Sequence, residues 1–179
     1  MIRKRVDKMD RSKMDNSVDV SAYIADGTRV AGSGISIGKD SSIWLNCVIR
    51  CDHDQTVTIG ERTNVQDISM IHITPGIPVR IGNDVSIGHM CLIHGCEIGD
   101  NTLIGMGSII MDGAKIGRDC IIGAGSLVTE GTVVPDGKMF FGRPARYVRD
   151  LTPEEIENNR EIAEGYVRLK DEWMGRKSD

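Results

Sequence analysis

Aromatic residues are scarce in this sequence: two Trp, three Tyr and two Phe make up 4% of its 179 residues, although 40% of them are hydrophobic. Its core must therefore be built mainly from Ile, Val and small residues. Positive charge is not in excess either, because 22 Lys and Arg against 26 Asp and Glu give a net charge of −4. The chain lacks the basic field that holds nucleic acid, so we expect no nucleic-acid partner.

Long apolar runs are also missing. No stretch approaches the ~18 residues of a membrane span, and the basic residues of segment 1–8 are not followed by the apolar part of a secretory signal. The five cysteines are an odd number, and nothing indicates an oxidising compartment, so we expect reduced thiols. These absences predict a cytoplasmic protein without a membrane partner.

Glycine, in contrast, is abundant, with 21 residues, and many of these follow Ile at intervals of six residues or a multiple of six. Filling the gaps gives a ladder of aliphatic positions at Ile37, Ile43, Ile49, Ile59, Val65, Ile71, Ile81, Ile87, Ile93, Ile98, Ile104, Ile110, Ile116, Ile122, Val128 and Val134. Hexapeptide repeats indicate a parallel β-helix. We therefore predict an all-β solenoid in which three repeats make one coil of a triangular prism.

A second pattern, independent of the glycines, supports this prediction. The chain must turn tightly into the interior four residues after a ladder position, where only small residues fit. That position is occupied by Ser41, Cys47, Thr63, Val85, Cys91, Thr102, Ser108, Ala114, Cys120, Ser126 and Thr132. None of these residues is large or charged, as the prism requires.

The cysteines admit a different interpretation, a zinc site made from Cys47 and Cys51 or from Cys91 and Cys96. Their spacings of four and five are not the two-residue knuckles of structural zinc sites. We expect the cysteines at small inward positions, Cys96 and Cys120 included, to behave as small hydrophobic residues. Only Cys51 is expected in an outward loop, as a free thiol.

The ladder is interrupted at three places. The steps from Ile49 to Ile59 and from Ile71 to Ile81 are each four residues too long, which indicates loops inserted at corners, over 51–54 and about 74–77. The step from Ile93 to Ile98 is one residue short. Loops inserted into a rigid solenoid often carry function.

Three segments divide the chain. Residues 17–148 hold the repeats and form the β-helix domain, and residues 149–179 form a C-terminal segment with an amphipathic helix over about 153–174, packed on the prism. Thr152 and Glu155 supply a capping box for this helix. Residues 1–16 are highly charged with little apolar content, so we expect a loosely ordered extension.

Three of the four histidines fall within 23 residues of each other. A count of prism faces along the ladder puts His72 and His94 on one face in consecutive coils, roughly one strand spacing apart. Two imidazoles at that distance can share one metal ion. A single surface histidine is more often merely solvated, but two histidines at the same position in adjacent coils favour a metal site.

His89 falls on the preceding face, with Gln66 and Asp67 in the column beside it. Faces of a prism point away from one another, so His89 cannot easily reach the same ion within one chain. A neighbouring subunit of a closed three-fold oligomer could bring it there. The face count thus predicts a three-histidine site divided across an interface.

Segments 48–52, 59–67 and 87–99, together with His72, resemble the gamma-class carbonic anhydrase family in residue order, spacing and type. The resemblance extends from about residue 18 to the C-terminal helix. It implies a left-handed parallel β-helix that assembles as a homotrimer. His72 and His94 of one subunit and His89 of its neighbour would bind Zn²⁺, or Fe²⁺, Co²⁺ or Ni²⁺.

The resemblance further implies reversible hydration of CO₂ to bicarbonate by a metal-bound hydroxide at the trimer interface. Gln66 would hydrogen-bond the metal-bound water, with Asn64 beside it. Arg50, Asp52 and Asp67 would form an ion network between subunits. These five residues are the predicted catalytic set.

Two features differ from the family pattern. Cys51 stands where the family usually has Gly, and the loop after His72 has no carboxylate for proton transfer, which leaves His53 as a candidate shuttle. Two alternative functions stay open: an acyl-CoA transferase or thioesterase of the hexapeptide-repeat type, and a catalytically weak metal-binding scaffold. The transferase chemistry needs one histidine base and a groove for CoA rather than three clustered histidines.

Overall fold

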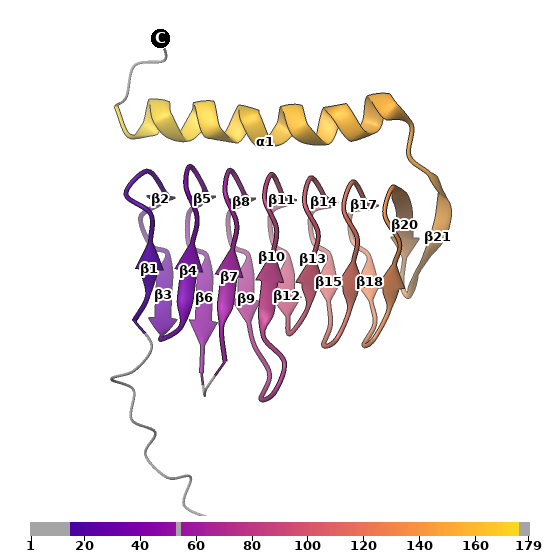
Figure 1. Ribbon diagram of the computed structural model, residues 1–179, viewed down its shortest axis with the longest axis horizontal. Coiled ribbons are helices and arrows are strands. Elements are labelled where there is room, and N and C mark those ends of the chain that lie inside the picture. The colour runs from indigo at the N-terminus through magenta and orange to yellow at the C-terminus, as the bar shows by residue number, and fades with distance from the viewer. Residues whose placement is uncertain (1–14, 53–54, 176–179) are drawn as a thin grey trace, which may run out of the picture.

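The computed structural model describes residues 15–52 and 55–175. It is a left-handed parallel β-helix with one α-helix lying along its side (Figure 1), which confirms the predicted fold. The predicted extension over residues 1–16 lies outside the described residues except for its last two. The candidate shuttle His53 lies outside them as well.

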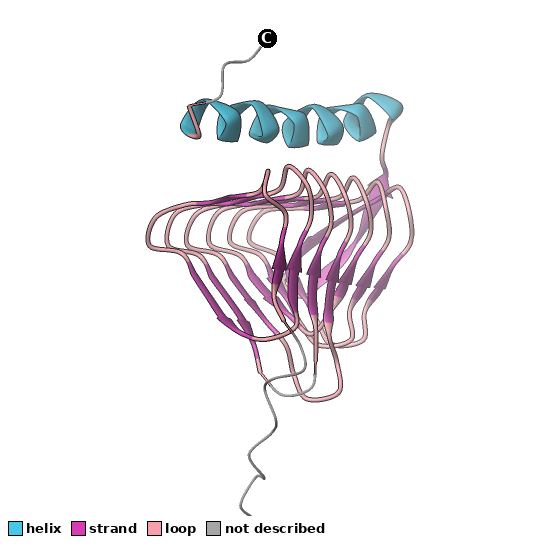
Figure 2. Ribbon diagram, turned by 60° about the vertical axis from the view of Figure 1, so that its left-hand side comes forward, coloured by secondary structure: helices cyan, strands magenta, loops and turns pink. Residues whose placement is uncertain are grey.

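Three sheets form the sides of a triangular prism (Figure 2). The seven-stranded sheet contains β1 (Ser17–Val18), β4 (Ile35–Ile37), β7 (Val57–Ile59), β10 (Val79–Ile81), β13 (Glu97–Ile98), β16 (Lys115–Ile116) and β19 (Val133–Val134). The eight-stranded sheet contains β2 (Tyr23–Ile24), β5 (Ser42–Ile43), β8 (Asn64–Val65), β11 (Ser86–Ile87), β14 (Leu103–Ile104), β17 (Ile121–Ile122), β20 (Lys138–Gly142) and β21 (Ala145–Asp150). The six-stranded sheet contains β3 (Arg29–Gly32), β6 (Val48–Cys51), β9 (Met70–His72), β12 (Leu92–His94), β15 (Ile109–Ile110) and β18 (Leu127–Val128).

The core is the aliphatic ladder. Every predicted ladder residue is buried, with an exposed fraction between 0 and 3%. Each rung pairs in register with the rung one coil away, as Ile71 does with Ile49 and Ile93. Because burying one such side chain contributes roughly 1.5–3 kcal/mol, this column is the main source of stability in a chain with few aromatic rings.

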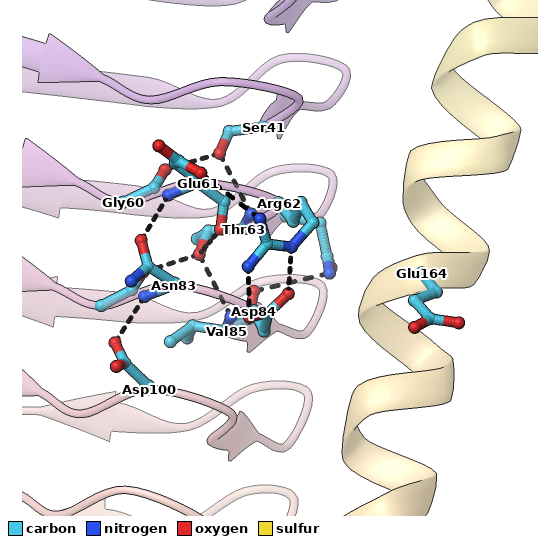
Figure 3. Close-up of polar contacts among 12 residues, drawn as sticks. Ser41, Gly60, Glu61, Arg62, Thr63, Asn83, Asp84, Val85, Asp100 and Glu164 are labelled. Carbon is cyan, nitrogen blue, oxygen red and sulfur yellow. Dashed lines mark hydrogen bonds and ion pairs between the residues drawn. The ribbon is translucent and has the colours of Figure 1, made fainter.

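The small inward residues also join successive coils by hydrogen bonds (Figure 3). Ser41 Oγ donates to Gly60 O at 2.7 Å and accepts from Thr63 N at 3.0 Å. One coil further on, Thr63 Oγ1 donates to Gly82 O at 2.7 Å and accepts from Val85 N at 3.1 Å. A hydroxyl at this position therefore satisfies one donor and one acceptor of the corner backbone. A larger side chain would not fit at this position.

All five cysteines are buried and unpaired. The prediction of an outward loop position for Cys51 is wrong. Cys51 is the last residue of β6, pairs with Gly32 in β3 and is only 1% exposed. Its thiol donates to Gln55 O at 3.1 Å, and burial raises its pKa. The strand thus runs further than the ladder suggests, and the inserted loop begins after Cys51.

Helix α1 (Pro153–Trp173) begins with the predicted capping box. Thr152 Oγ1 accepts from Glu155 N at 3.3 Å, and Glu155 Oε2 accepts from Thr152 N at 3.0 Å. The proline at the first helical position has no N–H to leave unsatisfied. The C-cap is Met174, where the predicted range ends.

The helix runs back along the solenoid toward its first coils (Figure 1). Most of the few aromatic residues gather beneath its C-terminal half, where Trp44 makes edge-to-face contacts with Tyr23, Tyr166 and Trp173. Lys170 is fully buried, and its Nζ lies 3.1 Å from an Asp40 carboxylate oxygen. These contacts fix the helix over the eight-stranded sheet.

The solenoid ends in an antiparallel pair, β20 with β21, that the repeat pattern does not predict. Its turn lies at residues 142–145, which include Gly142, Arg143 and Pro144. Within the described ranges, no helix is both long and apolar enough to cross a bilayer.

Candidate functional site

His72 and His94 lie on neighbouring rungs of the six-stranded sheet. They are the last residues of β9 and β12 and pair in register, which is the stacking that the face count predicts. His72 Nδ1 lies 3.0 Å from His94 Nε2, and the ring centroids are 5.1 Å apart. Both side chains are partly buried, at 16% and 30% exposure. The two imidazoles therefore direct ring nitrogens at one point on the prism face.

Charged side chains contact the outer nitrogens of this pair. Arg50, one rung before His72, places Nη2 2.8 Å from His72 Nε2, and Asp52 Oδ2 lies 3.1 Å from the same nitrogen. Arg50 Nε also pairs with Asp52 at 2.8 Å. On the other side, His94 Nδ1 lies 2.5 Å from Asp112 Oδ1.

His89 occupies a different place, the corner between the eight-stranded and six-stranded sheets. It follows β11 in a turn, and its Nδ1 lies 2.8 Å from Asp67 Oδ2, in the turn one coil earlier. The His89 side chain is 40% exposed. Met106 occupies the same column one coil later, since Gly107 N donates to His89 O at 2.8 Å.

Gln66 and Asn64 form a buried amide chain next to this corner. Gln66 Nε2 donates to Asn64 Oδ1 at 3.1 Å, and Asn64 Nδ2 donates to Ser86 Oγ at 2.8 Å. Gln66 is 6% exposed and Asn64 1%. The amide of Gln66 is therefore held in one orientation by its neighbours rather than by solvent.

Comparisons with known proteins show the family of this chain. The chain is 49% identical over 154 residues to a probable carbonic anhydrase of Methanocaldococcus jannaschii, covering 86% of this chain and 96% of that one. The chain belongs to the gamma carbonic anhydrase family. It is also 40% identical over 158 residues to the mitochondrial gamma carbonic anhydrase 1 of Arabidopsis thaliana, covering 85% of this chain but only 57% of the plant protein's length.

Other members of the wider hexapeptide group carry transferase names. Family models described as bacterial transferase hexapeptide (six repeats) and as hexapeptide repeat of succinyl-transferase match residues 95–130 and 78–110. A crystal structure titled putative acetyltransferase from Bacillus cereus superposes with a TM-score of 0.86 at 41% identity, covering 90% of this chain and 93% of that one. This chain and the Bacillus cereus structure therefore share the same fold.

In this gamma carbonic anhydrase family member, a single chain does not bring all predicted ligands together. His72 and His94 meet, whereas His89 lies around the corner on Asp67. Over residues 15–52 and 55–175, no three His, Cys, Asp or Glu side chains form a group able to hold an ion. The predicted ion network is divided in the same way, with Arg50 and Asp52 beside His72 and Asp67 beside His89.

Two residues near the site were not predicted from the sequence. Asp112 contacts His94, and its register was detectable, because it follows Ile110 by two residues as Gly95 follows Ile93. Tyr166 of α1 lies close enough to Asp67 that burial and this charge raise the pKa of its hydroxyl. The helical pattern marks Tyr166 only as a residue that faces the prism.

Proposed function

We propose that this chain is a metal-dependent, carbonic anhydrase-like enzyme that reversibly hydrates CO₂ to bicarbonate. The observation that carries this proposal is the pair of imidazole nitrogens 3.0 Å apart on His72 and His94. The family relationship adds the reaction and the substrate. The five unpaired thiols are consistent with a cytoplasmic setting.

The residues present fit a divalent ion. Two nitrogens ~2.0–2.1 Å from one ion at a tetrahedral angle lie roughly 3.3 Å apart, close to the separation in the histidine pair. Each ring also has an aspartate on the nitrogen that faces away: Asp52 for His72 and Asp112 for His94. This is the arrangement that orients metal-binding histidines in proteins. Imidazole ligands suit Zn²⁺, Fe²⁺, Co²⁺ and Ni²⁺ alike.

The third ligand in this proposal is His89 of a neighbouring copy in a homotrimer. Its corner position and 40% exposure leave it free to face another subunit. Apolar side chains surround it at the same corner: Ile68 is 63% exposed, Met90 62% and Met106 54%. Exposed apolar residues stacked along one edge are suited to burial against a second subunit.

When bound, the divalent ion supplies a nucleophile near neutral pH by lowering the pKa of water toward ~7. The chain's own residues orient the reactants. Gln66, held through Asn64, presents a fixed amide that can hydrogen-bond the nucleophile but cannot act as a base, because an amide does not titrate. Arg50 and Asp52 hold His72 in place.

A stopped-flow pH-indicator assay of CO₂ hydration tests the proposal, with protein loaded in turn with Zn²⁺, Co²⁺ and Fe²⁺. We expect a rate above buffer that disappears in His94→Ala and falls in Gln66→Leu. Asp136→Asn, an exposed carboxylate on the seven-stranded side, is the matched control and should retain the rate. Metal-loaded protein without any rate above buffer would contradict the enzymatic proposal.

An acyl-CoA transferase or thioesterase is the second candidate, supported by the similarity to the Bacillus cereus protein described as an acetyltransferase, at 41% identity. It predicts thermal stabilisation by coenzyme A in the absence of metal. A metal-binding scaffold, the third candidate, predicts bound metal with neither hydration nor stabilisation by coenzyme A.

A further inference from the structure

Asp112 lies in the turn after β15, one coil beyond His94. Its Oδ1 lies 2.5 Å from His94 Nδ1, and the two side chains are 26% and 30% exposed. A carboxylate accepts hydrogen bonds and does not donate them when ionised, so His94 must donate from Nδ1. The neutral ring then carries its lone pair on Nε2.

That lone pair faces the point where the histidine pair meets. His94 Nε2 lies 3.0 Å from His72 Nδ1, so in the metal-free chain His72 donates this hydrogen bond. His72 Nε2 lies between a donor, Arg50 Nη2 at 2.8 Å, and a carboxylate acceptor, Asp52 Oδ2 at 3.1 Å. The assignment of His94 does not depend on His72, because it follows from the contact between Asp112 and His94 Nδ1.

Gly95 makes room for this contact. It follows His94, at φ +44°, within the step that is one residue short. A Cβ added at Gly95 would lie 2.5 Å from Asp112 Oδ1. Gly113 N donates to Gly95 O at 2.7 Å, which holds the two turns together. The shortened step and its glycine thus let a carboxylate from the next coil reach back to His94.

We propose that Asp112 is a positioning residue that fixes the tautomer and orientation of His94, so that Nε2 is the nitrogen offered to the metal. This proposal rests on the proposed metal site. It adds a role for a residue outside the three predicted ligands and the predicted catalytic set. Carboxylates in this position typically change metal affinity by ~10–100-fold.

Titration of the full-length protein with Co²⁺ alone tests the effect on binding. Asp112→Ala should weaken Co²⁺ binding by ~10–100-fold, and Asp112→Asn, which keeps an acceptor oxygen, should weaken it less. Asp100→Asn is the matched control, because Asp100 is also a corner carboxylate and accepts from Asn83 N at 2.7 Å (Figure 3). It follows β13 of the seven-stranded sheet, whereas the paired histidines end β9 and β12 of the six-stranded sheet. This control should leave Co²⁺ affinity unchanged.

The ¹⁵N signals of His94 in metal-free protein provide a second measurement. We expect protonation at Nδ1 in the wild type and in Asp100→Asn, and loss of that preference in Asp112→Ala. A His94 protonated at Nε2 in the wild type would overturn the proposal, as would unchanged Co²⁺ affinity in a folded Asp112→Ala protein. A wild type that binds no Co²⁺ contradicts the proposed function instead, and the tautomer measurement then still decides the role of Asp112.

Discussion

A site divided between two copies of the chain can be rebuilt from two defective variants. His89→Ala removes the corner imidazole and leaves the stacked pair, whereas His94→Ala disrupts the pair, whose nitrogens lie 3.0 Å apart, and leaves the corner. Each variant alone should lose metal binding. Together in mixed trimers they should recover it, because one copy can supply what the other lacks.

The magnitude follows from three-fold geometry. A site is intact only where a His89→Ala copy supplies the pair and a His94→Ala copy supplies the corner imidazole. Equal random mixing gives this arrangement at about one quarter of all sites. Every trimer that contains both variants has a single intact site, so such trimers should bind about one ion each.

Co-expression with two affinity tags, followed by purification over both, isolates the mixed trimers for metal analysis and CO₂ hydration. His72→Ala with His94→Ala is the matched control, since both changes fall on the same side of the interface and no copy retains a complete pair. That mixture should recover nothing. Recovery in the control, or none in the test mixture, would refute the division of the site.

Three further predictions concern stability and reactivity. Val134→Ala should lower the free energy of unfolding by roughly 2–3 kcal/mol, because it removes two buried methyl groups and leaves a cavity. Val133→Ala in the same strand should change the free energy of unfolding little, since Val133 is 64% exposed. Chemical denaturation of both variants measures the difference. Arg149 and the helix cap lower the pKa of Glu155 from 4.5 to about 2, so the ionised carboxylate contributes stability above pH 4.5 that is lost as pH falls through about 2. Glu155→Gln should therefore reduce the fall in melting temperature between pH 4.5 and pH 2. An unchanged fall would contradict this prediction. Burial raises the pKa of Cys96 to about 12 and that of Cys91 to about 11. Both thiols in the native protein should therefore resist alkylation by iodoacetamide at pH 8, as counted by mass spectrometry. Rapid modification of either thiol before unfolding would show that burial does not protect it.

Much of this molecule can be predicted from its sequence because the repeat fixes register. The six-residue spacing determines which residues stack, so the rungs of Ile71 and Ile93 and the histidines after them follow by counting. The capping box at Thr152 is equally local. Local patterns and strict periodicity are therefore sufficient for the fold and for the histidine pair.

The remaining features depend on side-chain direction or on segments without a repeat. Asp112 reaches His94 diagonally across a coil, through space that only the absent side chain of Gly95 provides. Cys51 is buried because β6 continues past the ladder position before the loop begins. The β20–β21 pair lies beyond the last repeat, so periodicity carries no information about it.

Helix α1 alters how this chain holds together. A bare stack of coils touches only its nearest neighbours and can unravel from either end. Here helix α1 holds the first coils in place, through Lys170 on Asp40 and Trp173 on Tyr23. A protease cut between Asp150 and Thr152 should consequently loosen the opening rungs, far from the nick, and turn an all-or-none melt into gradual fraying.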